Sequence, residues 1–188
     1  MRATQLRTWT VAEYHQMLAV GLLKSEDRLE LLNGHIIEMS PQEPPHAATT
    51  RRVGRYLDQH LGGLADIRTQ LPITLGERSE PEPDIAIARL DPQEYGDRHP
   101  GAADLFWVIE VADSTLNKDR KEKALLYGQA GIPEYWVLDV KRRRAFIFRQ
   151  PEEAGYQIIQ ECNTGEAIRP LAFPDCLIPL DALFLAIP

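Results

Sequence analysis

One stretch of the chain, LFWVIEV from Leu105 to Val111, is apolar on both faces of the strand that it predicts. Side chains alternate along a β-strand, so a surface strand normally alternates between apolar and polar residues. Alternation gives two sets of side chains on opposite faces: Leu105, Trp107, Ile109 and Val111 on one, and Phe106, Val108 and Glu110 on the other. A strand with two apolar faces belongs inside a sheet that is covered on both sides.

Glu110 is the residue that such a strand should not tolerate without compensation. An ionised carboxylate removed from water is costly unless it is paired, protonated or bound to a metal. Asp84 raises the same question, because it opens a second apolar strand, DIAIAR, directly after Pro83. On neighbouring strands the two carboxylates would converge and repel, and Mg²⁺ or Mn²⁺ would offset that repulsion. For either residue alone, a strand-end cap, a salt bridge or simple exposure is the alternative.

The remaining patterns predict helices and strands around this pair. Three helices are expected: TVAEYHQMLAVGLL with a Thr10–Glu13 capping box, PPHAATTRRVGRYLDQHL ending at Gly62-Gly63, and a helix from about Lys118 to Ala130. Further strands are expected in RLELLNGHIIEMS, a hairpin turning at Asn33-Gly34, in ADIRTQLPITL, with Pro72 marking an edge or bulge, and in EYWVLDV and AFIFRQ. The tail is expected to add short strands and a final helical turn. The predicted fold class is therefore α/β (α+β), with a mixed central sheet flanked by helices.

Length and composition suit one domain over residues 1–188, which buries roughly 70% of its unfolded surface. No apolar run is long enough to span a membrane, and the N-terminal stretch lacks the apolar core of a secretory signal. The two cysteines, Cys162 and Cys176, form no CxxC pair. They predict reduced thiols and a cytoplasmic location, with one disulfide as the alternative.

The charge distribution bears on nucleic-acid partners. A net charge of −7 weighs mildly against them, because nucleic-acid binders usually carry a basic face. Basic residues nevertheless cluster in TTRRVGR at 49–55, NKDRKEK at 117–123 and KRRR at 141–144. Each cluster taken alone is more typical of a solvated helix face or a hairpin turn.

Three residues on the helix after the apolar strand share one face, because Asp119, Lys123 and Tyr127 are spaced four apart. One interpretation is an ion pair worth about 0.3–0.5 kcal/mol with a tyrosine packed below it. The other places the Lys123 ammonium over the two carboxylates. There it would orient or help deprotonate a metal-bound water and offset charge in a phosphate transition state. The sequence has no GxxxxGK, GxSxG or HExxH motif, and its histidine and cysteine spacings do not indicate zinc.

The ordered set EPDIAIA, LFWVIEVADST and DRKEKALLYGQAGIPEYWVLD resembles the PD-(D/E)XK nuclease superfamily, specifically the Uma-type family of restriction-endonuclease-like proteins. RLELLNGHIIEMSP, followed by His46, is similar to the N-terminal pattern of that family. The resemblance covers about residues 8–185 and implies a restriction-endonuclease-like core.

The resemblance also implies roles for individual residues. Asp84 and Glu110 match the two acidic motif positions and would be metal ligands, with the backbone carbonyl of Val111 as a third. Ala112 stands where the superfamily has its lysine. Lys123 matches a lysine that the Uma-type pattern carries on the next helix.

Three further residues stay open at this point. Lys121 is the fallback for the catalytic lysine, although it lies on a different helix face, about 200° from Lys123. Glu30 matches an early glutamate of the pattern and is either a metal or water ligand or one polar residue of a hairpin. His46 could contact phosphate, but a lone histidine is more often structural.

The function that the resemblance implies is metal-dependent hydrolysis of phosphodiesters by a DNA endonuclease, with Mg²⁺ or Mn²⁺ as cofactor. DNA is the implied partner, with RRVGR and KRRR as candidate backbone contacts, and a homodimer is the implied assembly. Two alternatives remain. One is a DNA-binding or assembly protein that kept the fold without turnover, and the other is a hydrolase of a smaller phosphodiester.

Overall fold

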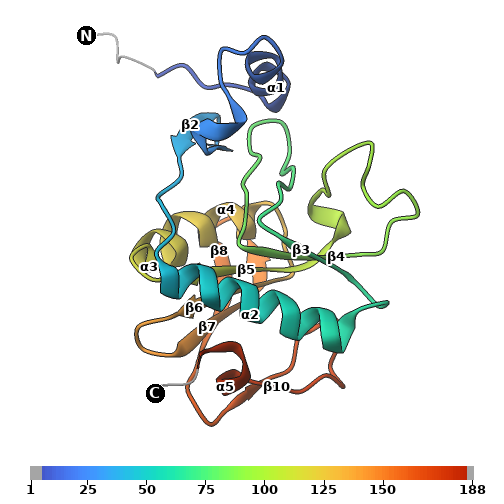
Figure 1. The fold of residues 1–188 in the computed structure, drawn as a ribbon, viewed down its shortest axis with the longest axis vertical. Helices are drawn as coiled ribbons and strands as arrows, with labels where there is room; N and C mark the ends of the chain where they lie inside the picture. Colours follow the sequence, from blue (N-terminus) through green and yellow to red (C-terminus); the bar gives the residue numbers. More distant parts are fainter. Residues whose placement is uncertain (1–5, 186–188) are drawn as a thin grey trace.

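The computed structural model describes residues 6–185 and is built around a six-stranded sheet (Figure 1). The expectations for one domain over 1–188 and for the N-terminal stretch extend to residues 1–5 and 186–188, outside the described part. The strands in spatial order are β3 (Asp66–Thr69), β4 (Ile85–Ala88), β5 (Leu105–Ala112), β6 (Glu134–Asp139), β7 (Arg144–Glu152) and β8 (Gly155–Cys162). β5 and β6 run parallel and the other neighbours antiparallel, so the sheet is mixed as predicted.

Helices and short strands complete the chain on both faces of this sheet. The helices are α1 (Val11–Ala19), α2 (Pro44–Leu61), α3 (Leu116–Lys118), α4 (Ala124–Gln129) and α5 (Leu180–Leu183). A π-helical turn covers Asp119–Lys123, and 3₁₀ turns cover Ser25–Asp27 and Ala102–Asp104. Two small sheets pair β1 (Leu29–Leu32) with β2 (His35–Glu38), and β9 (Ala167–Ile168) with β10 (Ile178–Pro179). The predicted fold class is confirmed.

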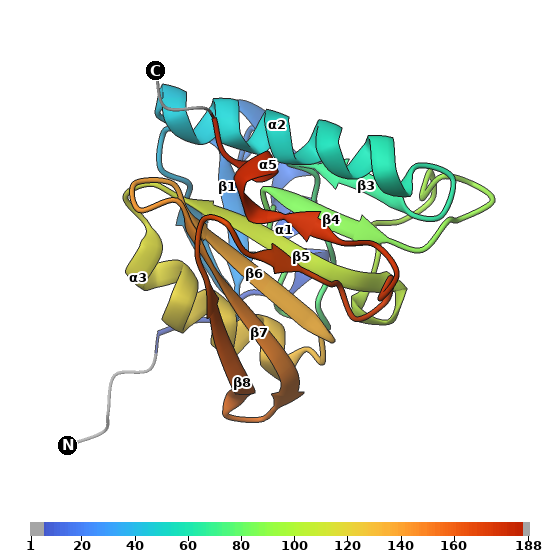
Figure 2. The ribbon, with the colours of Figure 1, turned by 90° about the horizontal axis from the view of Figure 1, so that it is seen from below.

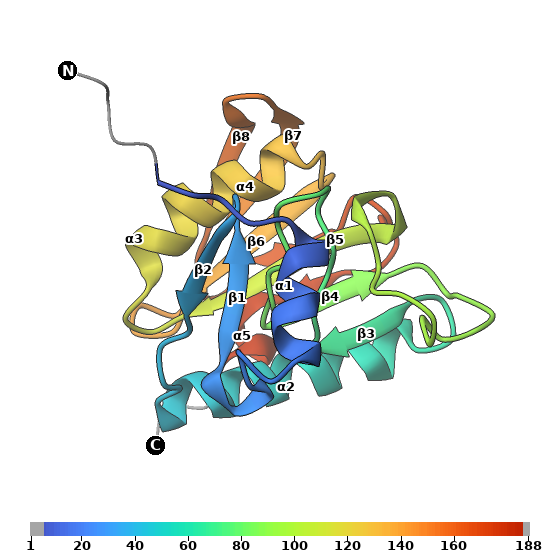
Figure 3. The same ribbon diagram turned by 90° about the horizontal axis from the view of Figure 1, so that it is seen from above.

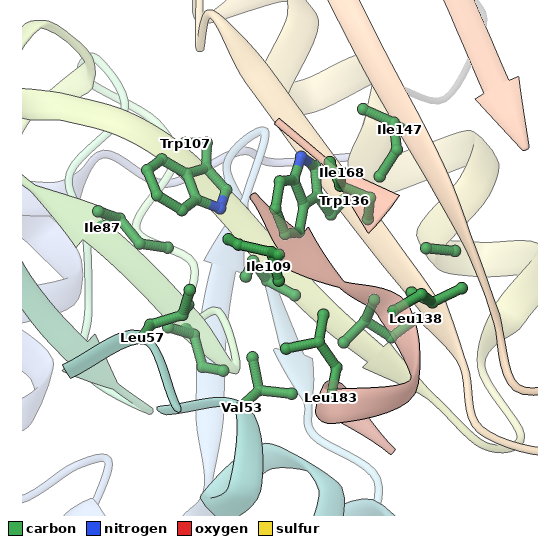
Figure 4. Packing of buried hydrophobic residues seen from close by; sticks show 14 of the residues in the cluster. Val53, Leu57, Ile87, Trp107, Ile109, Trp136, Leu138, Ile147, Ile168 and Leu183 are labelled. Carbon is green, nitrogen blue, oxygen red and sulfur yellow. The ribbon is translucent and has the colours of Figure 1, made fainter. Parts of the chain in front are cut away.

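Two apolar cores hold the layers together. α2 and α5 pack on one face of the sheet through Val53, Leu57 and Leu183, against Trp107 and Ile109 of β5 (Figure 4). On the other face, α4 packs its buried side chains against the strands. Figure 2 shows α2 and α3 on opposite sides of the sheet. β5 is therefore internal and covered on both faces, as its sequence predicts.

The N-terminal helix and hairpin form a unit at the opposite end of the molecule from α5 (Figure 1). α1 starts at the predicted capping box, in which Thr10 and Glu13 bond each other's backbone amides. Asn33 and Gly34 have φ of 50° and 79°, the left-handed pair that a two-residue hairpin turn requires. The Tyr14 hydroxyl donates to the Leu29 carbonyl, which fixes α1 beside the hairpin (Figure 3).

Alternation along β5 breaks at its first two residues. Leu105 packs with the α4 face and Phe106 with the α2 face, the reverse of the expected assignment. The cause is a register shift against β4, where Ile87 pairs with Trp107 but Ala88 pairs with Leu105. The extra residue, Phe106, acts as a β-bulge and exchanges the sheet faces to which Leu105 and Phe106 point.

Two element boundaries also differ from the expectation. β3 ends at Thr69, before Pro72, because Gln70 adopts a left-handed φ of 53° and leaves the sheet. The helical segment predicted from Lys118 begins at Leu116 and is not α-helical throughout. Within residues 6–185, no helix has both the length and the apolar character needed to cross a membrane.

Gly128 on α4 offers a test of the packing between that helix and β8. A Cβ at this position would overlap the backbone carbonyl of Gly155. Gly128→Ala should therefore lower the free energy of unfolding by about 1–3 kcal/mol, even though alanine is the better helix former. Gly101→Ala is the matched control, because its Cβ would meet its nearest atoms at an ordinary 3.7 Å. Urea unfolding measures both, and a Gly128→Ala protein as stable as the control would contradict this packing.

Candidate functional site

The candidate site lies at the end of the sheet where β4 begins and β5 ends. The last residues paired at this end are Ile85 and Ile109, so one further step in the same register brings Asp84 opposite Glu110. Directly opposed residues of antiparallel strands point to the same face. The two carboxylates singled out in the sequence are therefore neighbours at the rim of the sheet.

Asp84 accepts a hydrogen bond where the ladder between the two strands stops. Its Oδ2 accepts from the backbone N–H of Val111 at 2.8 Å. The N–H and C=O of one strand residue point to the same side, so the Val111 carbonyl faces this gap as well. Two side chains also reach Asp84: the Gln70 amide donates to Oδ1 at 3.4 Å, and His46 Nε2 lies 3.0 Å from Oδ2.

The helical segment that follows β5 supplies the hydrogen-bond partners of Glu110. The Lys123 ammonium donates to its Oε1 at 2.8 Å, and the Tyr127 hydroxyl donates to the same oxygen at 2.7 Å. Glu110 is only 3% exposed and Lys123 7%. Among the described residues, both hydrogen bonds reach Oε1 and none reaches Oε2, so one oxygen of Glu110 is left for another ligand.

The π-helical turn determines where along the helix axis Lys123 lies relative to Glu110. One extra residue in a helical turn shifts the side chains that follow it, and such turns are common at functional sites. Asp119 and Lys123 are both buried on the inner face of this turn, and Tyr127 follows them on α4. The predicted shared face is therefore present. Asp119 accepts from Thr115 Oγ1 at 2.5 Å rather than pairing directly with Lys123.

Burial and charge shift the titration of this cluster in opposite directions. Burial raises the pKa of the Glu110 carboxyl, with the Lys123 charge acting against that shift and Asp84 adding to it. Burial alone would lower the pKa of Lys123, but the negative charges of Glu110, Glu30 and Asp119 outweigh it and raise the pKa. Lys123 is therefore held as a cation at neutral pH.

Glu30 enters the site from β1 of the N-terminal hairpin. It is buried, and its Oε1 accepts from Lys118 at 3.4 Å while its Oε2 lies 3.7 Å from the Lys123 ammonium. Oε2 has no hydrogen-bond partner within residues 6–185. A buried carboxylate oxygen without a donor is a place for a water or a cation. The structure thus brings Glu30 to the site, and its role as a metal or water ligand stays a prediction.

His46 stands on the opposite side of Asp84, on the first turn of α2. Burial lowers the pKa of this histidine, but the hydrogen bond to Asp84 and the nearby negative charges outweigh burial, so its pKa is raised. Its other ring nitrogen, Nδ1, is buried and has no partner in the described chain. The sequence ranked His46 as structural, whereas the structure makes it a direct neighbour of Asp84.

One cleft collects these groups. Its lining includes the predicted residues Glu30, Asp84, Glu110, Val111 and Lys123. Lys121, the fallback lysine, is exposed and does not line the cleft.

Sequence reasoning missed two residues that also line this cleft, Gln70 and Glu82. Glu82 could have been found, because Glu80, Glu82 and Asp84 alternate in EPEPD and strand periodicity places them on one side. Burial raises the pKa of the Glu82 carboxyl, with Arg28 acting against the shift. Gln70 could not be found from the sequence, since its position depends on its own left-handed backbone conformation just after β3.

The donor atoms suit a partly hydrated Mg²⁺ or Mn²⁺ ion better than a metal ion that is enclosed entirely by protein ligands. No group of three or more His, Cys, Asp or Glu side chains in residues 6–185 is arranged to hold a metal by itself. Mg²⁺, however, typically takes one or two carboxylates and completes its shell with water and substrate phosphate. Asp84, the unbonded Oε2 of Glu110 and the Val111 carbonyl supply oxygen donors of that kind.

Comparison with known proteins identifies the family of this chain. The chain matches the family described as "Uma2: Putative restriction endonuclease" over residues 11–181. It belongs to that family. A comparison with curated proteins found no match.

A solved structure from Anabaena variabilis ATCC 29413, described as a "putative nuclease belonging to DUF820", is similar to the Uma2 chain with a TM-score of 0.70. The similarity covers 88% of this chain and 94% of that chain at 18% sequence identity. At that identity the likeness establishes the fold alone. This chain thus shares the fold of that structure, in agreement with the fold that the resemblance implied.

Removing the Lys123 ammonium should expose the cost of burying Glu110. Lys123→Met leaves an unpaired carboxylate and should lower the free energy of unfolding by about 3–5 kcal/mol at pH 8. Because burial holds the pKa of Glu110 above its unfolded value, stability is retained at low pH and lost as pH rises above about 5. Denaturant unfolding between pH 5 and 9 measures this slope.

Two companion variants sharpen that measurement. Glu110→Gln in the Lys123→Met background removes the unpaired charge and should restore most of the lost stability at pH 8. Lys121→Met removes an exposed lysine from the same helical turn and should change stability by no more than about 0.5 kcal/mol. A Lys123→Met loss that is independent of pH, or no larger than that of Lys121→Met, would contradict the buried pair.

Proposed function

We propose that this Uma2 chain is a Mg²⁺- or Mn²⁺-dependent endonuclease that hydrolyses DNA phosphodiesters in the cleft between β4, β5 and the π-helical turn. One observation carries the proposal: two carboxylates from adjacent strand ends lie beside a buried lysine, with Lys123 Nζ 2.8 Å from Glu110 Oε1. A site built only to stabilise the fold gains little from three buried charges, because their desolvation offsets their attraction.

Asp84, Glu110 and the Val111 carbonyl would hold the cation. When bound, the cation polarises the scissile phosphate and lowers the pKa of its bound water. Asp84 is prepared for this role by the Val111 N–H, which fixes the orientation of its carboxylate. Gln70 and His46 restrain the same group from two other directions.

Lys123 would act as a fixed positive charge. Its raised pKa keeps it protonated, so it donates hydrogen bonds to the attacking water or to a phosphate oxygen and does not serve as the base. Such a preorganised cation stabilises the charge that develops in the transition state. In this proposal Lys123 performs the role of the superfamily lysine, whose position is occupied by Ala112 in this chain.

Glu30 would position water in the cleft. Its Oε2 lacks a hydrogen-bond donor within the described residues and lies on the Lys123 side of the site. A water or hydrated cation held there would contact the carboxylates from above the sheet. Glu30 is thus proposed as a positioning residue.

DNA contacts are proposed for α2 rather than for the KRRR turn. Arg51 and Arg55 are exposed one turn apart on α2, whose first turn carries His46, and neither forms an ion pair within residues 6–185. The turn arginines are engaged instead: Arg144 pairs with Asp139 and Glu161, and Arg143 contacts Asp181. RRVGR therefore remains a candidate backbone contact, while KRRR is better explained by these ion pairs.

The other expectations remain predictions. A homodimer and a cytoplasmic location are implied by family resemblance and composition, and no contact within the chain bears on either. A fold that binds DNA without turnover, or a hydrolase of a smaller phosphodiester, would use the same cleft. The experiments below separate these cases.

Plasmid cleavage tests the proposed site. With Mg²⁺ or Mn²⁺, the wild-type protein should nick supercoiled DNA, and EDTA should abolish the nicking. Asp84→Asn and Lys123→Met should each reduce the rate by about 100-fold or more, because each removes a group that acts on the reacting phosphate. Lys121→Met should cleave like wild type. Circular dichroism checks that each variant is folded, and agarose gels measure the rates.

Different outcomes separate the alternatives. Cleavage that survives in Lys123→Met but not in Asp84→Asn would remove the lysine from the mechanism. Metal-dependent hydrolysis of bis-p-nitrophenyl phosphate that duplex DNA does not inhibit would favour a smaller substrate. DNA binding without hydrolysis of either substrate would favour the assembly protein.

The proposed contacts of Arg51 and Arg55 can be tested separately through the salt dependence of DNA affinity. Each phosphate contact that is lost should reduce the slope of log affinity against log salt by about 1. Arg51→Ala and Arg55→Ala should therefore weaken duplex binding and flatten this slope, whereas Arg144→Ala should leave the slope unchanged. Fluorescence anisotropy from 50 to 300 mM salt, with Ca²⁺ in place of Mg²⁺, measures it. An unchanged slope in both α2 variants would exclude this contact surface.

A further inference from the structure

The two edges of the central sheet are protected to very different degrees. β3 is four residues long, carries Asp66 and Arg68, and leaves the sheet at the left-handed Gln70. Short length, charged side chains and early departure from the sheet are the devices by which proteins prevent strand addition at an edge. The β3 edge therefore needs no partner.

β8, at the other edge, has almost none of these devices. It is eight residues long, and its five residues Gln157–Glu161 are exposed in an unbroken row. Ile158 and Ile159 are 42% and 55% exposed and project from opposite faces. The strand has no proline and no lysine, and the carboxylate of Glu161 is neutralised by Arg144 at 2.9 Å. A long edge that exposes two isoleucines among uncharged or neutralised side chains is a site for pairing with another strand.

We propose that β8 pairs with β8 of a second copy of this chain, antiparallel and across a two-fold axis through Ile159. The pairing would join two six-stranded sheets into one continuous sheet. It would also cover the unbonded backbone groups of the edge and the two exposed isoleucines.

Symmetry and charge together favour a second copy as the occupant. An antiparallel pair of identical strands has its two-fold axis perpendicular to the sheet, so one residue must face itself. With Ile159 on the axis, the two Ile159 side chains meet on one face, Ile158 meets Gln160 on the other, and Gln157 meets Glu161. No like charges are opposed, and the one carboxylate meets an amide donor.

The proposed interface is separate from the cleft. β5, which carries Glu110, is three strands away from β8 in the sheet, and no β8 residue lines the cleft. The dimer therefore does not depend on the proposed nuclease activity. Changes on β8 can be made without altering the groups proposed to act on phosphate.

The contact area is small, so the dimer should be weak. Paired edges of eight residues bury less than the roughly 1,200–2,000 Å² of a standard stable interface. A dissociation constant of about 1–100 μM is expected. Sedimentation velocity over this concentration range should show the mass rising from 21.3 kDa toward twice that value.

One substitution tests the location of the interface. Ile159→Lys places two ammonium groups against each other at the axis and should raise the dissociation constant by roughly tenfold or more. Leu90→Lys is the matched control, because Leu90 is equally exposed, at 58%, but lies outside β8, and its dimer should be unchanged. A protein that stays monomeric at 200 μM, or a dimer insensitive to Ile159→Lys, overturns the proposal.

A cysteine pair tests the register. In a Cys176→Ser background, Ile159→Cys places two thiols on the axis with Cα atoms about 4.5–5.5 Å apart, within disulfide range. It should crosslink on mild oxidation. Ile158→Cys, whose own copy lies diagonally about 7–8 Å away, should not. Crosslinking of Ile158→Cys instead of Ile159→Cys overturns the register, and crosslinking of neither overturns the pairing.

Discussion

The ion pair between Lys123 and Glu110 is the interaction on which the rest of the site depends. Glu110 lies near the end of a strand that is covered on both faces, and the Lys123 ammonium at 2.8 Å compensates its charge. Tyr127 donates to the same oxygen, so the partners come from one helical segment. The other oxygen, Oε2, accepts no hydrogen bond from the described residues. A carboxylate that is half satisfied by its own fold is well suited to share its second oxygen with a cation.

The arrangement of strand ends explains why the other charges gather at this place. β4 stops pairing with β5 at Ile109, so the Val111 amide turns to the carboxylate of Asp84. The hairpin from the N-terminal unit then closes the cleft with Glu30. Lys123 is central to this arrangement, since it also lies 3.7 Å from Glu30. Loss of the lysine therefore leaves more than one carboxylate without a counter-charge.

Much of this could be predicted from the sequence, because strand periodicity and adjacency in the chain carry long-range information. Strand periodicity predicted that Asp84 and Glu110 would converge if their two apolar strands were neighbours, and i,i+4 spacing predicted the shared face of Asp119, Lys123 and Tyr127. What the sequence could not supply depends on single backbone conformations. The bulge that inverts Leu105 and Phe106, and the π-helical turn under Lys123, arise from tertiary packing and leave no periodic signal. His46 was undervalued for a related reason, since its partner is 38 residues away.

The most direct test of the account is Mn²⁺ binding, followed by electron paramagnetic resonance of the free ion in the absence of DNA. One Mn²⁺ should bind per chain and be displaced by Mg²⁺, with affinity reduced at least about tenfold in Asp84→Asn and unchanged in Lys121→Met. Absence of a stoichiometric site, or a site unaffected by Asp84→Asn, would contradict it. In that case the carboxylates at the ends of β4 and β5 would serve only the fold.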